Sequence, residues 1–264
     1  MMLLRKIPKL LHQPGFICLG VLTGRIFKHL QINIGQWISS IIFPLVFWGL
    51  FSLIMSKIMF HDGFDYTQML PASIIVQAII FSAMANASAI AKDHQSGLYQ
   101  RFKSMPVSPI SMIFSRVFGD MIKGIVAIIV LTFIGWVSGM RFYSGWYSIL
   151  LFTLIPFPFL ITVNLGMGII GHWLKIQEST SAIVSMIYAP LMMISTAFAP
   201  LKSFPEWIQP IVHYSPVTSV LSVMRSVLNG KSSVEPYLIP LINLLVLVII
   251  FSAFQYHILR RNLQ

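Results

Sequence analysis

Long stretches without a charged residue constrain this chain more than any other feature of its sequence. A helix needs about 20 mostly apolar residues to cross a bilayer. Five stretches meet that length, at 32–56, 66–91, 142–174, 179–201 and 236–259. A sixth, 124–140, reaches full length only if its helix begins near Val117 and includes Asp120 and Lys123, which stand three apart on one face and can pair. We therefore expect an all-α, polytopic membrane protein with six transmembrane helices, at about 34–57, 68–91, 117–139, 146–174, 179–200 and 236–258.

The composition excludes a soluble globular protein. Of the 264 residues, 56% are hydrophobic and 9% are charged, whereas a soluble domain carries about 25% charged residues. The net charge is +11, but the bases are scattered singly between apolar runs, which favours anionic lipid headgroups over nucleic acid as their partner. Cys18 is the only cysteine, which excludes an intrachain disulfide and a cysteine metal cluster.

The distribution of lysine and arginine predicts the orientation. These residues concentrate in 1–31, in the loop 92–116 and in the tail 260–264, while the opposite segments carry fewer bases and most of the acids. Since the side richer in lysine and arginine is normally cytoplasmic, we expect both termini and the loop 92–116 in the cytoplasm. Within 1–31, apolar residues fall on one helical face and Arg25 and Lys28 on the other, which predicts an interfacial amphipathic helix.

The segment 201–235 is expected to be an extracellular hairpin of short helices between spans five and six. Its stretch 207–224 is charge-free and offers a seventh span as the alternative. Pro210, Pro216 and several hydroxyl side chains make it a poor span, and a broken segment is tolerated only where protein or water satisfies its backbone.

Catalytic and metal-binding constellations are not recognisable in the sequence. Asp120 and Lys123 could form a proton relay, as in a proton-coupled secondary transporter, but a neutralised structural pair is the simpler interpretation. Gly230, Lys231 and Ser232 resemble the end of a phosphate-binding loop, but Arg225 stands where that motif needs a glycine. We therefore expect no catalytic residue, no metal site and no cofactor in this chain.

The loop 92–116 predicts a short amphipathic helix. Leu98, Phe102 and Met105 recur at helical spacing before Pro106 and Pro109, which we interpret as stops. Such a helix either lies on lipid headgroups or provides a docking knob for a cytosolic protein.

Two motifs resemble a known family, the permease subunits of type-2 ABC exporters, and especially its daunorubicin-resistance branch. The first motif is an acid, a glycine, an Arg-Phe pair and a proline stop, here Asp93, Gly97, Arg101, Phe102 and Pro106. The second lies in the predicted hairpin and comprises Pro200, Pro205, Trp207, Pro216, Thr218 and Arg225.

The resemblance implies a permease that works with other subunits. Two copies of a separate cytosolic ATPase would hold ATP and Mg, and a second permease, identical or similar, would complete the pathway in a bacterial plasma membrane. The implied ATPase-coupling residues are Asp93, Gly97, Leu98, Arg101, Phe102, Met105, Pro106, Arg25 and Lys28. The cargo would be a hydrophobic drug-like compound, a lipid or a lipid-linked glycan, and a non-transporting membrane scaffold is a further alternative.

An amphiphilic cargo would suit a pathway lined by apolar and aromatic side chains. Candidates in the predicted spans are Phe43, Trp48, Phe81, Tyr188 and Met192, with ordinary helix packing as the alternative for each.

Overall fold

A computed structural model describes residues 41–59, 66–103, 108–143, 145–230 and 235–263, and in these ranges it contains helices and turns but no strand. The all-α prediction is therefore confirmed for this part of the chain. The helices are α3 (Phe43–Met59), α4 (Tyr66–Gln95), α5 (Leu98–Lys103), α6 (Pro109–Val137), α7 (Trp146–Leu154), α8 (Pro156–Leu174), α9 (Gln177–Met193), η3 (Leu201–Ser203), α10 (Gln209–Tyr214), α11 (Pro216–Leu228) and α12 (Glu235–Leu263).

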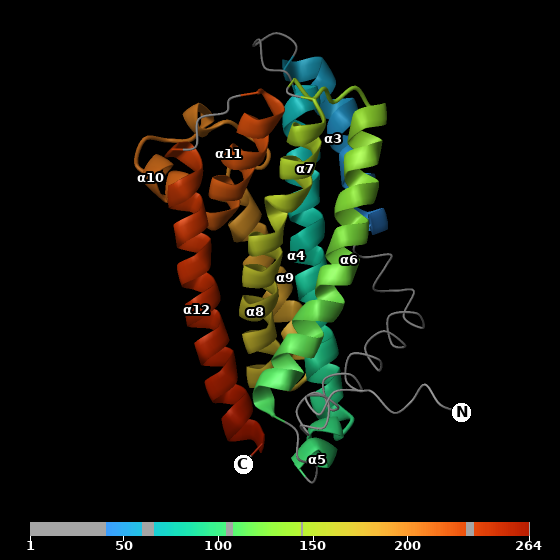
Figure 1. The fold of residues 1–264 in the computed structure, drawn as a ribbon, viewed down its shortest axis with the longest axis vertical. Coiled ribbons are helices and arrows are strands. Elements are labelled where there is room, and N and C mark those ends of the chain that lie inside the picture. Colours follow the sequence, from blue (N-terminus) through green and yellow to red (C-terminus); the bar gives the residue numbers. More distant parts are fainter. Residues whose placement is uncertain (1–40, 60–65, 104–107, 144, 231–234, 264) are drawn as a thin grey trace, which may run out of the picture.

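The long helices run side by side along one axis, with α5 at one end of the bundle and α10 and α11 at the other (Figure 1). Helix α4 forms the centre, and its residues Ile74, Ile75 and Ile80 have no more than 1% of their surface exposed. Helices α3, α6, α8 and α9 surround it, and α12 packs mainly on α8. The core is thus built around the most completely buried of the predicted spans.

Helices α4 and α8 approach each other closely. A Cβ atom placed on Gly171 would lie 2.5 Å from the backbone oxygen of Ala87, so only glycine fits at this crossing. Small residues at such contacts let helix backbones pack tightly in membranes.

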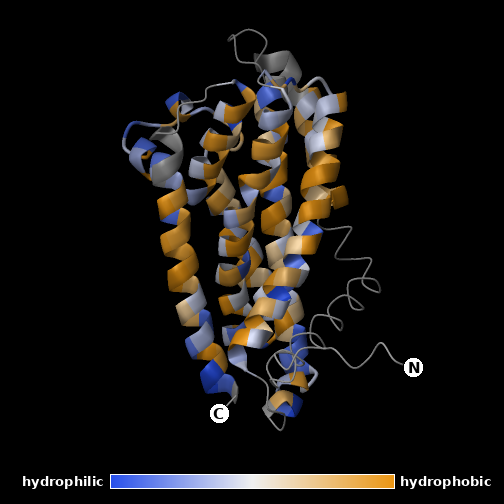
Figure 2. Cartoon of the chain, viewed as in Figure 1, coloured by the Kyte–Doolittle hydropathy of each residue, from blue (hydrophilic) through white to orange (hydrophobic). Residues whose placement is uncertain are grey.

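Apolar residues form a wide band around the middle of the bundle, and polar residues collect toward its two ends (Figure 2). Four helical segments in the described part are long and apolar enough to cross a membrane, at Gln68–Gln95, Pro109–Val137, Trp146–Leu174 and Pro240–Asn262. The apolar part of α3 and the helix α11 are shorter, and α9 is not among the four. The expectation of six spans thus remains a prediction for α3 and α9.

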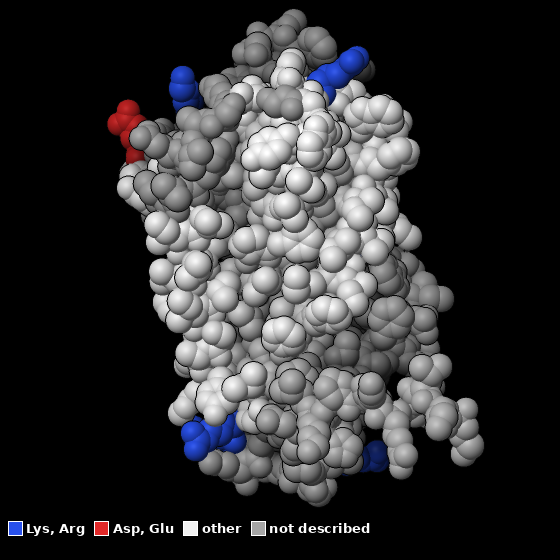
Figure 3. All heavy atoms as spheres, in the orientation of Figure 1, with Lys and Arg blue, Asp and Glu red and all other residues white. Residues whose placement is uncertain are grey.

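The face of the molecule in Figure 3 is almost free of charge along its middle, with lysine and arginine near the two ends. At the α5 end, the exposed charged residues are Lys92, Arg101, Lys175, Glu178, Arg260 and Arg261. At the opposite end, the exposed charged residues among those described are Arg141, Lys202 and Glu206. Bases therefore predominate at the α5 end.

Pro109 has a different role from the one we inferred. We interpreted it as a helix stop, but it occupies the first turn of α6, after the extended N-cap residue Ser108. Proline is well tolerated at this position because its missing N–H would have no partner inside the helix. The connection between α4 and α6 is consequently shorter than the loop 92–116 suggested.

The end of the fifth predicted span also differs. We expected one helix over 179–200, but α9 ends at Met193 and Pro190 lies in its last turn. Residues 194–200 are not helical, and the short helices η3, α10 and α11 follow. The predicted interfacial helix, with Arg25 and Lys28, lies outside the described residues.

Candidate functional site

The chain makes a sharp elbow between α4 and α5, at the end of the bundle where exposed bases predominate. Helix α4 ends at Gln95, and Gly97 has a φ of +72°, a conformation that favours glycine. The Gly97 carbonyl then accepts hydrogen bonds from the backbone N–H groups of Gln100 and Arg101, at 3.2 and 3.3 Å. Gly97 therefore reverses the chain and starts α5.

Tyr99 is the residue that fixes α5 to the bundle. Its side chain is 5% exposed and forms a small apolar cluster with Met112 of α6 and Leu259 of α12. The Tyr99 ring is stacked on the His94 ring, with centroids 3.7 Å apart, and meets His172 of α8 edge-on at 5.5 Å. One side chain of α5 thus contacts four other helices.

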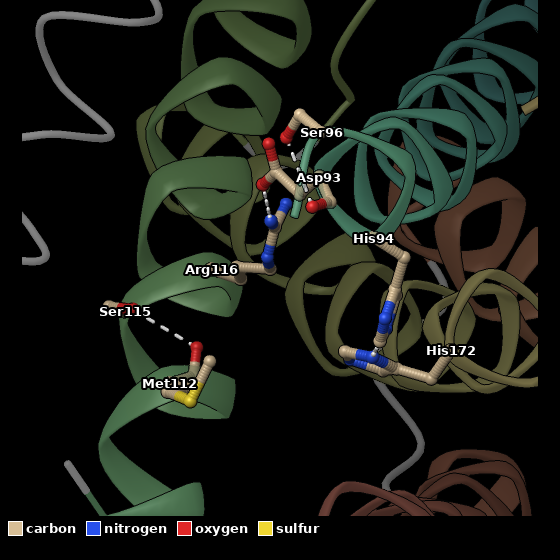
Figure 4. A network of polar contacts seen from close by, with 7 residues as sticks. All are labelled: Asp93, His94, Ser96, Met112, Ser115, Arg116 and His172. Atoms are coloured by element: carbon tan, nitrogen blue, oxygen red, sulfur yellow. Dashed lines mark hydrogen bonds and ion pairs between the residues drawn. The ribbon is translucent and has the colours of Figure 1, made fainter. Parts of the chain in front are cut away.

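A pair of histidines extends this cluster. The Nε2 atom of His94 lies 3.1 Å from Nδ1 of His172, so one imidazole donates a hydrogen bond to the other (Figure 4). The backbone oxygen of His172 also accepts a hydrogen bond from the Asn262 side chain at 3.3 Å. These contacts tie the ends of α4, α8 and α12 together beneath α5.

The placement of Phe102 corrects our interpretation of the amphipathic helix. A docking knob would present Phe102 on its exposed face, but Phe102 is half-buried, packs against the Tyr99 cluster and meets the Tyr99 ring edge-on at 6.1 Å. The apolar face of an amphipathic helix packs on whatever apolar surface is nearest, and here that surface is the protein itself. Among the α5 side chains that the structure describes, those of Gln100 and Arg101 are exposed and that of Leu98 is half-buried. Met105 and Pro106 lie outside the described residues.

An ion pair joins the elbow to α6. The carboxylate of Asp93, in the last turn of α4, binds the guanidinium of Arg116, and Figure 4 shows these two side chains pointing toward each other. Both side chains are about one-fifth exposed. Asp93 therefore holds α4 to α6, and the coupling role that the family resemblance implies for it stays a prediction.

Arg116 begins a row of charges along α6. Asp120 and Lys123 form an ion pair, and their side chains are only 5% and 4% exposed. Arg116 also interacts electrostatically with both Asp93 and Asp120. Because a buried charge is stable only when it is compensated, this alternation of acids and bases explains how α6 carries charges into the bundle.

The candidate pathway residues fall into two groups. Phe43 of α3 meets Phe81 of α4 edge-on at 5.1 Å, and Phe81 lies 4.8 Å from the Tyr188 ring of α9. Tyr188 is in turn anchored by the Gln77 side chain, which donates a hydrogen bond to its hydroxyl at 2.7 Å. Trp48 and Met192 are instead buried in the core, at 7% and 2% exposed.

The hairpin residues also separate. Thr218 and Arg225 of α11 turn inward: the Thr218 hydroxyl accepts a hydrogen bond from the Thr196 N–H at 3.1 Å, and Arg225 donates one to Ser73 of α4 at 2.9 Å. Pro205 and Trp207 are exposed, whereas Pro200 and Pro216 are half-buried. Neither α10 nor α11 has the length of a span, being 6 and 13 residues long.

Sequence reasoning missed the residues that organise the α5 end, namely Tyr99, His94, His172 and Arg116. A signal existed for one contact only, since Asp93 and Arg116 are opposite charges at the two ends of one predicted loop. Among the described residues, no group of three or more histidine, cysteine, aspartate or glutamate side chains could hold a metal ion.

Comparison with known proteins identifies the family. A family model described as ABC-2 family transporter protein matches residues 59–254. The daunorubicin resistance ABC transporter permease protein DrrB1 of Streptomyces coeruleorubidus is 22% identical over 206 residues, which cover 78% of this chain and 72% of the relative. The probable doxorubicin resistance ABC transporter permease protein DrrC of Mycobacterium tuberculosis is 28% identical over 217 residues, which cover 79% of this chain and 74% of the relative.

The match with the family model extends from the end of α3 into α12 and includes the elbow, α5 and the hairpin. The chain belongs to the ABC-2 family of transporter proteins and is a multi-pass permease of the drug-exporter type.

Proposed function

We propose that this chain is the transmembrane half of an ATP-driven exporter that moves hydrophobic or amphiphilic drug-like compounds out of the cytoplasm or the inner leaflet. Support comes from the family and from relatives whose names specify daunorubicin and doxorubicin resistance. ATP and Mg would be held by two copies of a separate cytosolic ATPase subunit. Two permeases, as a homodimer or with a similar chain, would enclose the pathway in a bacterial plasma membrane.

The α5 end of the bundle would face the cytoplasm. Lys92, Arg101, Lys175, Arg260 and Arg261 are exposed there, and lysine and arginine accumulate on the cytoplasmic side of membrane proteins. Both termini would lie on this side, and six spans, including α3 and α9, would cross the membrane. The short helices η3, α10 and α11 would then face outward.

The observation that carries the proposal is the buried position of the Tyr99 ring between α4, α6, α8 and α12. An ATPase subunit bound to the exposed residues Gln100 and Arg101 would move α5 as a lever. The buried ring of Tyr99 would pass that movement directly to α8 and α12, and the Asp93–Arg116 pair would pass it to α6. ATP binding could shift the permease between two states only through contacts whose free energy differs between those states. The contacts at the elbow between α4 and α5 would be of this kind.

The pathway would run along α3, α4 and α9. The rings of Phe43, Phe81 and Tyr188 follow one another there, and Ser185, three residues before Tyr188 on α9, is exposed. Aromatic rings combined with a few hydroxyl groups suit an amphiphilic compound. Trp48 and Met192 would stabilise the surrounding core.

A cross-linking experiment tests the docking of the ATPase. In a Cys18→Ser background, Arg101→Cys should cross-link to the ATPase subunit through a short bifunctional thiol reagent. Lys202→Cys is the matched control, because Lys202 is exposed at the opposite end of the bundle. It should not cross-link to the ATPase subunit. Cross-linking at position 202, or equal yields at both positions, would contradict the proposed docking and orientation.

A further inference from the structure

The turn that follows α9 is buried although it is not helical. Ser195 and Ala197 are 1% and 5% exposed, and α9 has already ended at Met193. Backbone groups that are buried outside a helix must be satisfied by other parts of the protein. This requirement falls on residues from elements that are far apart in the sequence.

Arg225 and Ser73 supply those hydrogen bonds. The Ser73 hydroxyl of α4 donates to the backbone oxygen of Ala197 at 2.5 Å. The Nη2 atom of Arg225 donates to the Ser73 hydroxyl at 2.9 Å and reaches the same Ala197 oxygen at 3.4 Å. On the other side, the Thr196 N–H donates to the Thr218 hydroxyl at 3.1 Å. The turn is therefore held between α4 and α11.

Below this point, the seam between α4 and α9 is also polar. Gln77, one helical turn beyond Ser73, donates to Tyr188, and the hydroxyls of Ser88 and Ser181 lie 3.0 Å apart. Hydrogen bonds of this kind between membrane helices are individually weak. The contact made by Arg225 is charge-assisted and hence the stronger type. It lies at the end of the seam remote from α5.

We propose that Arg225 is a positioning residue of the transport cycle: it holds the turn 194–200 against α4 and keeps the outer end of the α4–α9 seam closed at rest. The part played in transport rests on the exporter function proposed above, whereas the closed seam is a property of the permease alone. Arg225 makes both contacts through one nitrogen, Nη2, which the rigid guanidinium plane holds in a fixed direction, whereas the ammonium of a lysine ends a flexible stem. Opening would require the turn to leave α4 and its polar groups to be hydrated.

Thiol labelling of the permease in nanodiscs, without ATP or the ATPase subunit, tests the proposal. The reporter is Ser195→Cys in a Cys18→Ser background, combined with Arg225→Met or Arg225→Lys. Since hydrogen bonds to charged groups are among the stronger contributions to stability, loss of this contact in Arg225→Met should speed labelling by about tenfold or more. Arg225→Lys should be intermediate. Ser73→Ala, which leaves the charge in place and removes its acceptor, should act in the same direction and serves if Arg225→Met does not fold.

A second reporter distinguishes local opening of the turn 194–200 from a general destabilisation of the bundle. Ser148 of α7 is 2% exposed and does not take part in the hydrogen bonds between Ser73, Ala197 and Arg225. Labelling of Ser148→Cys should not change in the Arg225 variants. Equally faster labelling at both reporters would assign Arg225 a merely structural role. An unchanged labelling rate at Ser195→Cys would overturn the proposal that Arg225 keeps the seam closed.

The link to transport has a separate readout. With Arg225 intact, addition of ATP and the ATPase subunit should accelerate labelling of Ser195→Cys, because the cycle opens the seam. If Arg225→Met speeds labelling without ATP but ATP has no effect on the labelling rate, the exporter function is contradicted. The proposal that Arg225 keeps the seam closed would still hold.

Discussion

Replacing Tyr99 with alanine should detach α5 from the bundle without unfolding the rest of the permease. The Tyr99 ring is almost fully buried and contacts residues of α4, α6, α8 and α12. Truncation of a buried aromatic side chain typically costs about 3–5 kcal/mol. The cluster is small and lies at an end of the bundle, so we take the lower limit of about 3 kcal/mol for this site.

This loss can be converted into a rate of proteolysis. Each 1.4 kcal/mol changes an equilibrium about tenfold, so the detached population of α5 should rise by about two orders of magnitude. Trypsin cleaves after Arg101 and Lys103, and its rate follows the population of the locally open state when opening and closing are fast. Cleavage in Tyr99→Ala should therefore be about 100-fold faster than in the unmodified permease.

Gln100→Ala is the matched control, because Gln100 is the next residue and is exposed. Its cleavage rate should change little, and Tyr99→Phe should retain most of the protection. Equal cleavage of Tyr99→Ala and Gln100→Ala would refute the reasoning that the buried ring holds α5 in place. Substrate-stimulated ATP hydrolysis should fall in parallel with the loss of protection in Tyr99→Ala.

Three further predictions concern other parts of the bundle. Gly171→Ala should lower the free energy of unfolding by about 2 kcal/mol, because the added Cβ would meet the backbone of α4. Gly49→Ala is the control in thermal unfolding, because a Cβ at Gly49 meets nothing within 4 Å. Similar unfolding midpoints for the two variants would contradict the close packing. Asp120→Asn and Lys123→Met should each destabilise by about 3 kcal/mol, and the double variant should recover much of this in the same assay, whereas additive losses would argue against a compensated pair. Arg101→Glu should reduce copurification of the ATPase subunit and leave the thermal midpoint unchanged; unaltered copurification would exclude a docking role for this residue.

The class of the fold could be predicted because the bilayer imposes a length and an apolarity that are visible in a single sequence. The stretch 66–91 became the central helix α4, and the predicted span 146–174 coincides with α7 and α8 taken together. The irregular end of α9 was harder to predict, because residues 194–200 are apolar enough to continue a helix. Their conformation depends on hydrogen bonds from Ser73 and Arg225, which are distant in the sequence.

The short helix at the candidate site could be predicted from the sequence, but the direction of its side chains could not. The helical spacing of Leu98, Phe102 and Met105 predicted a short helix in the loop 92–116, and the structure has α5 there, at Leu98–Lys103. The direction of Phe102 depends on how α5 folds back against α12, and no local pattern encodes that contact. Pro109 shows the same limit, since a proline ends one helix or begins another according to its flanking geometry.

The source of energy for transport tests the central claim most directly. The permease would be reconstituted into proteoliposomes with its ATPase subunit, and the movement of a fluorescent amphiphile such as doxorubicin would be followed with ATP or with an imposed pH gradient. We expect transport with ATP and Mg, none with the gradient alone, and none when the ATPase subunit is omitted. Transport driven by the pH gradient without the ATPase subunit, and lost in Asp120→Asn, would instead establish a proton-coupled carrier and contradict the exporter function.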